Sequence, residues 1–182
     1  MKLTETPLEG LFILEPKGLE DNRGFFMESY NKKKLEDLGI SAEFVQDNHS
    51  KSFKGVIRGL HFQNPPYEQT KLIRAVAGEL LDVVVDIRKQ SPTYGQKFAI
   101  LLSAKNKKQL YVPPGFAHGF VALEDGTEIL YKCDQYYNSE SEGGLLYSDP
   151  DLAIDWKVDL ESAVVSDKDK IHPTLSGFES QF

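Results

Sequence analysis

The chain has 182 residues, and among them is a single cysteine, Cys133. One thiol excludes an intrachain disulfide framework and is typical of proteins of the reducing cytoplasm. Long apolar runs are missing too, since no stretch approaches the ~20 residues that span a bilayer. The N-terminal segment MKLTETPLEG lacks the apolar core of a secretory signal. We therefore predict a cytoplasmic protein with no membrane association.

The chain also has fewer basic residues than acidic ones. The chain has 21 Lys and Arg against 28 Asp and Glu, a formal charge of −7. Nucleic-acid binding domains normally present a basic face, so we predict no nucleic-acid partner. The dense basic runs at 32–34 and 105–108 fall in a predicted helix and a predicted turn, and we interpret both as solvated surface. A phosphorylated metabolite can still be held by a few placed cations, because salt screens the distant net charge.

Several catalytic and nucleotide-binding motifs are absent. The chain has no glycine-rich loop of the G-x-G-x-x-G or G-x-x-x-x-G-K type and no G-x-S-x-G. Neither a bound dinucleotide nor ATP is therefore predicted. Cys133 has no histidine partner that spacing identifies, so nucleophilic catalysis is disfavoured and general acid–base chemistry remains.

Many short β-type segments are present. They include LFILEP, GVIRGLHFQ, KLIRAVAG, QKFAILLSA and TEILYKCDQYY, separated by Gly, Pro and Asn. This spacing predicts an all-β sandwich or barrel. Helical patterns occur only at about 32–38 and 162–171. The length suits one domain over 1–182, with a helical segment and a tail from about residue 160.

The strand predicted over 80–87 favours a barrel. Side chains alternate across a strand, so Asp82 and Asp86 share one face with Leu80 and Val84. Two aspartates on a strand this apolar indicate a polar interior rather than an open wet face. Such an interior is the expected place for a small-molecule site, although these two carboxylates can also serve the barrel alone.

Histidine is the natural proton carrier near neutral pH, and the chain has four. His61 lies in RGLHF and His118 in PPGFAHGF. Small barrels that bind a metal often use an H-x-H pair, but the position two after His61 is Gln63, a poor ligand beside imidazole. We therefore predict no metal and no other cofactor. A catalytic histidine commonly pairs with a carboxylate, and Asp167 and Asp169 in SDKDK are both candidates.

Taken in order, the segments EPKGLEDNRGFFMESYN, FVQDNHSKSFKGVIRGLHFQ, KLIRAVAGELLDVVVDIRKQSPTYG, LYVPPGFAHGFVALED, LYKCDQYY, SEGGLLYSDPDLAIDW and SDKDK make a specific pattern. It resembles the dTDP-4-dehydrorhamnose 3,5-epimerase family over nearly the whole chain. The resemblance implies a cupin-type jelly-roll barrel with a few short helices. It also implies a cofactor-independent isomerase of dTDP-L-rhamnose biosynthesis, whose substrate is a dTDP-4-keto-6-deoxy-sugar. A homodimer is expected, in which the Arg23 segment reaches the partner's site.

The resemblance also assigns roles to residues. It implies that His61 is the base, Asp169 rather than Asp167 its carboxylate partner, Tyr131 the acid on the opposite face of the sugar, and Lys71 the donor to the C4 oxygen. Positions expected to hold the nucleotide, diphosphate or sugar are Arg23, Glu28, Gln46, Asp47, Asn48, Arg58, His118, Glu142 and Lys168.

Three alternatives remain at this stage. A related enzyme could invert only C3 or only C5, although Tyr131 argues against a C3-only enzyme. A metal-dependent enzyme of the same fold is disfavoured by Gln63. A non-catalytic sugar-nucleotide binding protein is disfavoured by retention of the complete acid–base set.

Overall fold

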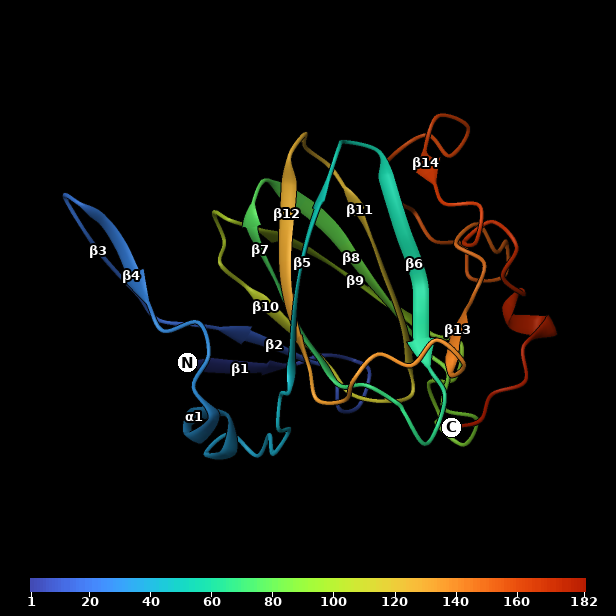
Figure 1. Ribbon diagram of the computed structural model, residues 1–182, viewed down its shortest axis with the longest axis horizontal. Coiled ribbons are helices and arrows are strands. Elements are labelled where there is room, and N and C mark those ends of the chain that lie inside the picture. Colours follow the sequence, from blue (N-terminus) through green and yellow to red (C-terminus); the bar gives the residue numbers. More distant parts are fainter.

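A computed structural model describes residues 1–182, and two antiparallel sheets face each other in it (Figure 1). In order across the first sheet lie β1 (Lys2–Glu5), β2 (Phe12–Glu15), β10 (Gln109–Val112), β7 (Lys71–Ala77), β12 (Thr127–Cys133) and β5 (Gln46–Ser52). The second contains β13 (Glu142–Gly144), β6 (Val56–Gln63), β11 (Phe116–Ala122), β8 (Glu79–Asp86) and β9 (Lys97–Ser103), and the short β14 (Val164–Val165) pairs in parallel with β6. The predicted all-β class is confirmed.

Side chains alternate along β8, so its two faces contribute to two different hydrophobic clusters. Leu80 and Val84 belong to the cluster enclosed between the sheets, whereas Val83 and Val85 belong to a second cluster on the outer face of their sheet. Asp82 and Asp86 share the inner face, and both are fully buried. The chain after β13 covers the outer cluster, which explains why β8 is apolar on both faces (Figure 1).

Two elements lie outside the two sheets, and the second of them packs on the first sheet through Leu35. Strands β3 (Gly18–Asp21) and β4 (Gly24–Met27) form a hairpin that projects away from the sheets, at the left of Figure 1. Helix α1 (Lys32–Glu36) follows the hairpin, capped by the Asn31 side chain. The helix predicted at about 32–38 is therefore present. After the helix the chain reverses direction at Gly39, whose φ of +85° suits glycine.

The prediction of a helix at 162–171 was wrong. That segment instead contains β14 and a series of turns. Val164 and Val165 pair with β6, and the Asp169 N–H donates to the Ser166 hydroxyl at 3.2 Å. Polar side chains that bond the local backbone favour turns over helix, and the β-branched pair adds a strand.

The C-terminal tail packs behind β6. The rings of Phe178 and Phe182 lie 5.3 and 6.1 Å from that of Phe62, and a short 3₁₀ helix, η1 (Leu175–Gly177), precedes them. The backbone N–H of Lys89 donates to the Phe182 carbonyl at 3.0 Å. The tail thus belongs to the outer core. None of the helices combines the length and the apolar character needed to cross a membrane.

Candidate active site

A cavity of about 590 Å³ opens between the two sheets. Strands β6, β11 and β13 form one wall, β7 and β12 form the other, and the turn after β14 closes one side. Eight of the predicted site residues line this cavity: Arg58, His61, Lys71, His118, Tyr131, Glu142, Lys168 and Asp169. Residues separated by more than a hundred positions are therefore gathered in one place.

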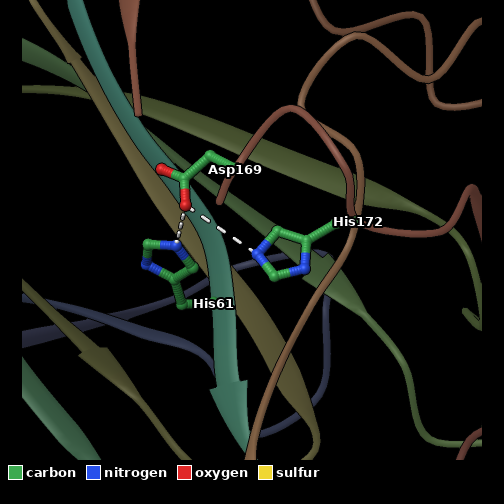
Figure 2. A group of neighbouring side chains, drawn as sticks. All are labelled: His61, Asp169 and His172. Atoms are coloured by element: carbon green, nitrogen blue, oxygen red, sulfur yellow. Dashed lines mark hydrogen bonds and ion pairs between the residues drawn. The ribbon is translucent and has the colours of Figure 1, made fainter. Parts of the chain in front are cut away.

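His61 and Asp169 form a close pair in this cavity. Strand β6 presents His61, and its Nε2 lies 2.7 Å from Oδ1 of Asp169, which comes from the turn at 166–170 (Figure 2). The other carboxylate oxygen, Oδ2, accepts the Gly59 N–H at 3.2 Å. Burial raises the pKa of Asp169, but its hydrogen bond to His61 and the histidine's charge outweigh burial and hold that pKa below its ordinary value.

The ionised carboxylate fixes the orientation of the His61 ring. An ionised carboxylate can only accept hydrogen bonds, so the Nε2 proton of His61 points to Asp169. The other ring nitrogen is then left to accept a proton. Because the carboxylate also stabilises the imidazolium that forms, the pair is chemically suited to act as a general base.

A second imidazole–carboxylate pair lies beside the first. His118 on β11 is the direct cross-strand partner of His61 on β6. Its Nε2 lies 2.9 Å from Oδ2 of Asp82 on the next strand, β8. The other oxygen of Asp82, Oδ1, has no hydrogen-bond partner although it is buried. The cavity wall therefore carries two imidazoles side by side.

The opposite wall carries Tyr131 and Lys71. Both project from the first sheet, with Tyr131 on β12 and Lys71 on β7. Burial raises the pKa of Tyr131, so its hydroxyl stays protonated at neutral pH. Burial lowers the pKa of Lys71, against the opposing effect of Cys133, Asp82 and Glu142. A lowered pKa makes the ammonium a stronger acid and hence a better donor to a developing oxyanion.

Glu142 and Lys168 form an ion pair at the cavity edge. The Tyr137 hydroxyl donates to the same Glu142 carboxylate at 2.7 Å. Sequence reasoning assigned no role to Tyr137, although it stands in the DQYY segment. The available signal was a pair of adjacent aromatic residues shortly before the SEGG segment. In the structure both side chains are more than half exposed.

Gly59 was also missed. Its φ is +126°, and a Cβ there would lie 2.5 Å from the Gly119 Cα on β11. Only glycine therefore lets β6 approach β11 closely enough at this position. The Gly59 N–H can then reach Asp169, so the glycine in RGLH supports the carboxylate of the pair.

Five predicted residues do not line this cavity. Arg23 sits at the tip of the β3–β4 hairpin and pairs with Asp21, and Glu28 pairs with Lys34 at 2.6 Å. Asp47 points to the outer face of β5, where it pairs with Lys132 at 2.9 Å. Gln46 and Asn48 lie on the same face as Tyr131 and are joined by a 3.0 Å hydrogen bond.

The position that would complete a metal-binding H-x-H pair is engaged elsewhere. The Gln63 amide is buried, donates to the Tyr67 carbonyl at 2.5 Å, and accepts the Asn138 N–H at 2.8 Å. The first contact holds the turn that follows β6. The second, with a further bond from the amide to the Tyr136 carbonyl at 3.3 Å, ties β6 to the loop after β12. The side chain therefore has a structural role in the loop and is not free to act as a ligand beside His61.

Comparison with known proteins identifies the family. The family model described as dTDP-4-dehydrorhamnose 3,5-epimerase matches residues 5–177. A dTDP-4-dehydrorhamnose 3,5-epimerase of Shigella flexneri is 52% identical over 93% of each chain. The crystal structure of the Bacillus anthracis enzyme with TDP and PPi bound is 51% identical, covers 95% of this chain and 98% of its own, and has a TM-score of 0.92.

A second solved relative comes from Legionella pneumophila, in complex with dTDP-4-keto-L-rhamnose. It is 47% identical, covers 98% of this chain and 94% of its own, and has a TM-score of 0.93. The agreement extends over sequence and fold together, and over nearly the full length of each relative. The chain therefore belongs to the dTDP-4-dehydrorhamnose 3,5-epimerase family of isomerases.

Proposed function

We propose that the chain converts dTDP-4-dehydro-6-deoxy-D-glucose to dTDP-4-dehydro-L-rhamnose by inverting C3 and C5. One observation carries the proposal: a carboxylate-backed imidazole, His61, lies on one wall of the cavity and a protonated tyrosine, Tyr131, on the other. Inversion at carbon requires removal of a proton from one face and its return on the other, and these two groups supply both.

The first step forms an enolate. The free ring nitrogen of His61 takes the proton beside the keto group, and the C–H electron pair moves into the carbonyl, leaving negative charge on the C4 oxygen. Lys71 donates to this oxygen from inside the barrel. Its lowered pKa strengthens that donor at the atom where negative charge develops.

The second step returns a proton from the other side. Tyr131 donates its hydroxyl proton to the carbon and the enolate collapses back to the ketone. The tyrosine then regains a proton from solvent, and His61 releases to solvent the proton that it took from the substrate. The raised pKa of Tyr131 keeps the donor loaded at neutral pH. No electron is transferred overall and no hydride moves, so the scheme needs no metal and no other cofactor.

Hydrogen-bond donors on the cavity wall, two of them cationic, are suited to the diphosphate. Arg58 and His118 lie on neighbouring strands beside His61, and Lys168 lines the same cavity from the turn at 166–170. We assign the sugar-nucleotide contacts to these residues together with Gln46, Asn48 and Glu142. The Asp47 carboxylate, on the outer face of its strand, supports the site only by bonding Lys132.

The projecting hairpin supports a homodimer. Leu19, Phe25 and Phe26 on β3 and β4 are 59%, 56% and 70% exposed. Lys107 reaches Glu20 and the Phe25 ring, but the hairpin projects from the barrel and leaves these apolar side chains exposed, which favours a covering surface (Figure 1). We assign that surface to a second copy of the chain, whose cavity would receive Arg23 and Glu28. We assign the whole chain to one cytoplasmic domain of the pathway to dTDP-L-rhamnose.

Incubation with the 4-keto-6-deoxyglucose nucleotide in heavy water, followed by NMR, tests the function. Deuterium at both C3 and C5 with the L-rhamno product is the expected result. Incorporation with inversion at one carbon only would identify a mono-epimerase instead. Bound iron or zinc at one per chain, together with loss of activity on chelation, would contradict the cofactor-free scheme.

A further inference from the structure

His172 lies directly behind the catalytic pair and has no role in the scheme above. Its ring packs on the backbone of β13, where a Cβ at Gly144 would lie 2.5 Å from the His172 Nε2. The side chain is 12% exposed, and Nε2 has no hydrogen-bond partner although it is buried. A buried imidazole nitrogen without a partner is costly, so this one needs an explanation.

The unpartnered nitrogen is directed at the carboxylate that His61 uses. The His172 Nε2 lies 3.8 Å from Oδ1 of Asp169, and the His61 Nε2 lies 2.7 Å from the same oxygen (Figure 2). The donor atoms of all three residues fall within 4.8 Å of one another. Two imidazoles and one carboxylate thus converge on one small volume.

This donor set and spacing suit zinc. Two histidines and a carboxylate are a known zinc-binding set, with bonds of about 2.0–2.2 Å. Two donors on a tetrahedral ion with such bonds lie roughly 3.3 Å apart. The two measured separations, 2.7 and 3.8 Å, bracket that value. The ring nitrogens of the two histidines lie within 4.8 Å of each other. Side-chain shifts of roughly 0.5 to 1.5 Å would therefore bring all three separations to that value and leave the fourth position to solvent.

The charges around the cluster are compatible with a cation. Burial and the neighbouring His61 lower the pKa of His172, so its imidazole is neutral at neutral pH and has a lone pair to offer. The lowered pKa of Asp169 keeps its carboxylate ionised. Among nearby cations, Lys168 is held in an ion pair with Glu142, which offsets its repulsion.

We propose that His61, Asp169 and His172 form an inhibitory binding site for Zn²⁺. The ion needs the Nε2 lone pair of His61, so the single proton of that neutral ring moves to its other nitrogen. That nitrogen is the one that must accept the substrate proton, and the base is blocked while zinc is bound. The inhibitory consequence rests on the proposed function, whereas the binding site itself does not.

Calorimetric titration of ZnCl₂ into the chelator-treated enzyme tests the site without substrate. The expected result for the wild type is one zinc per chain. His172→Asn and His172→Leu each remove a ligand, so they should weaken zinc binding by at least the roughly 10–100-fold seen when a residue that only supports a ligand is changed. The Leu variant is included because an Asn side chain could still coordinate zinc, or could pack poorly in this buried position. His49→Asn is the matched control, because His49 pairs with Glu128 on the surface at 3.0 Å and should not alter binding.

Activity assays then test the consequence. Zinc should inhibit the wild type reversibly, with full recovery on adding EDTA. Both His172 variants should have wild-type activity without zinc and keep it at zinc concentrations that inhibit the wild type. Absence of binding to the wild type, or equal binding by the His172 variants, would overturn the site. Binding at His172 without inhibition would overturn the inhibitory role, and inactivity of all proteins without zinc would count against the proposed function instead.

Discussion

The two imidazole–carboxylate pairs in the cavity wall differ in surroundings, although His61 and His118 face each other on adjacent strands. The His61 side chain is 31% exposed and that of His118 is 11% exposed. Asp169 has both oxygens engaged, by His61 and by the Gly59 N–H, whereas Asp82 has one oxygen without a partner. The first pair is thus open on the imidazole side and firmly held on the carboxylate side.

This difference separates a proton-transfer pair from a binding pair. A general base must reach the substrate and must have its tautomer fixed from behind, and only His61 meets both conditions. His118 is almost enclosed and its partner is itself part of the barrel interior. We therefore expect changes in the first pair to affect the chemical step and changes in the second to affect binding and stability.

Replacing the two histidines gives the largest expected contrast. His61→Ala should lower kcat by roughly 10²–10⁴-fold and abolish exchange of substrate protons with heavy water, because the base is removed. His118→Ala should raise KM and retain exchange at saturating substrate. Both are measured by NMR in heavy water alongside steady-state kinetics. Wild-type exchange in His61→Ala would reassign the base, and loss of exchange in His118→Ala alone would reverse the two roles.

Replacing the carboxylates gives the next largest contrast. Asp169→Asn should lower kcat by about 10²-fold or more with KM nearly unchanged, because an amide can stabilise the wrong tautomer and cannot stabilise the imidazolium. Asp82→Asn should affect kcat less than tenfold. Steady-state kinetics at several pH values measure both effects. Equal losses of kcat in the two variants would show that the pairs are not functionally distinct.

Tyr131→Phe tests whether either histidine could also return the proton. The variant should keep His61-dependent exchange with solvent but lose inversion at C5, because the donor on the opposite wall is missing. NMR of the product in heavy water reads exchange and stereochemistry together. Normal inversion at C5 would assign the acid to another group, with His118 as the first candidate to replace.

A buried carboxylate away from the cavity should give the smallest effect on catalysis. Burial raises the pKa of Asp86, but hydrogen bonds from the Arg88 guanidinium and two hydroxyls outweigh it and hold that pKa below its ordinary value. A carboxyl group whose pKa is lowered by folding stabilises the folded state. This stabilisation is complete above the pKa of Asp in the unfolded chain, about 3.9, and is lost as the pH falls through the lower pKa of the folded state.

Asp86→Asn should therefore lower the stability by about 1.5–3 kcal/mol at pH 7, with kcat and KM unchanged. For a chain of this size that is a decrease of several degrees in Tm. The difference from the wild type should shrink as the pH falls below about 4. Thermal denaturation from pH 7 to 3 measures it, and a constant difference across that range would contradict the assignment.

Local pattern was sufficient for much of the barrel. Period-two alternation with Gly and Pro punctuation predicted the strands, and the two aspartates of β8 predicted a polar interior. Local pattern failed at 162–171. There the Ser166 hydroxyl accepts the Asp169 N–H, which favours a turn, and β6 offers a strand edge to Val164. The pairing with β6 joins distant parts of the chain and is not visible within a sequence window.

The sequence by itself determined the residue types, the strand periodicity and, through the order of its motifs, the family. It could not choose between Asp167 and Asp169 on spacing alone, and nothing in it marked His172. Only the tertiary structure brought the turn at 166–170 onto β6, 108 positions from His61, and turned Asp47 away from the cavity. The physical reason is that the His61–Asp169 hydrogen bond, and the face on which Asp47 lies, both depend on the register between segments that are distant in sequence. Packing of the whole barrel sets that register.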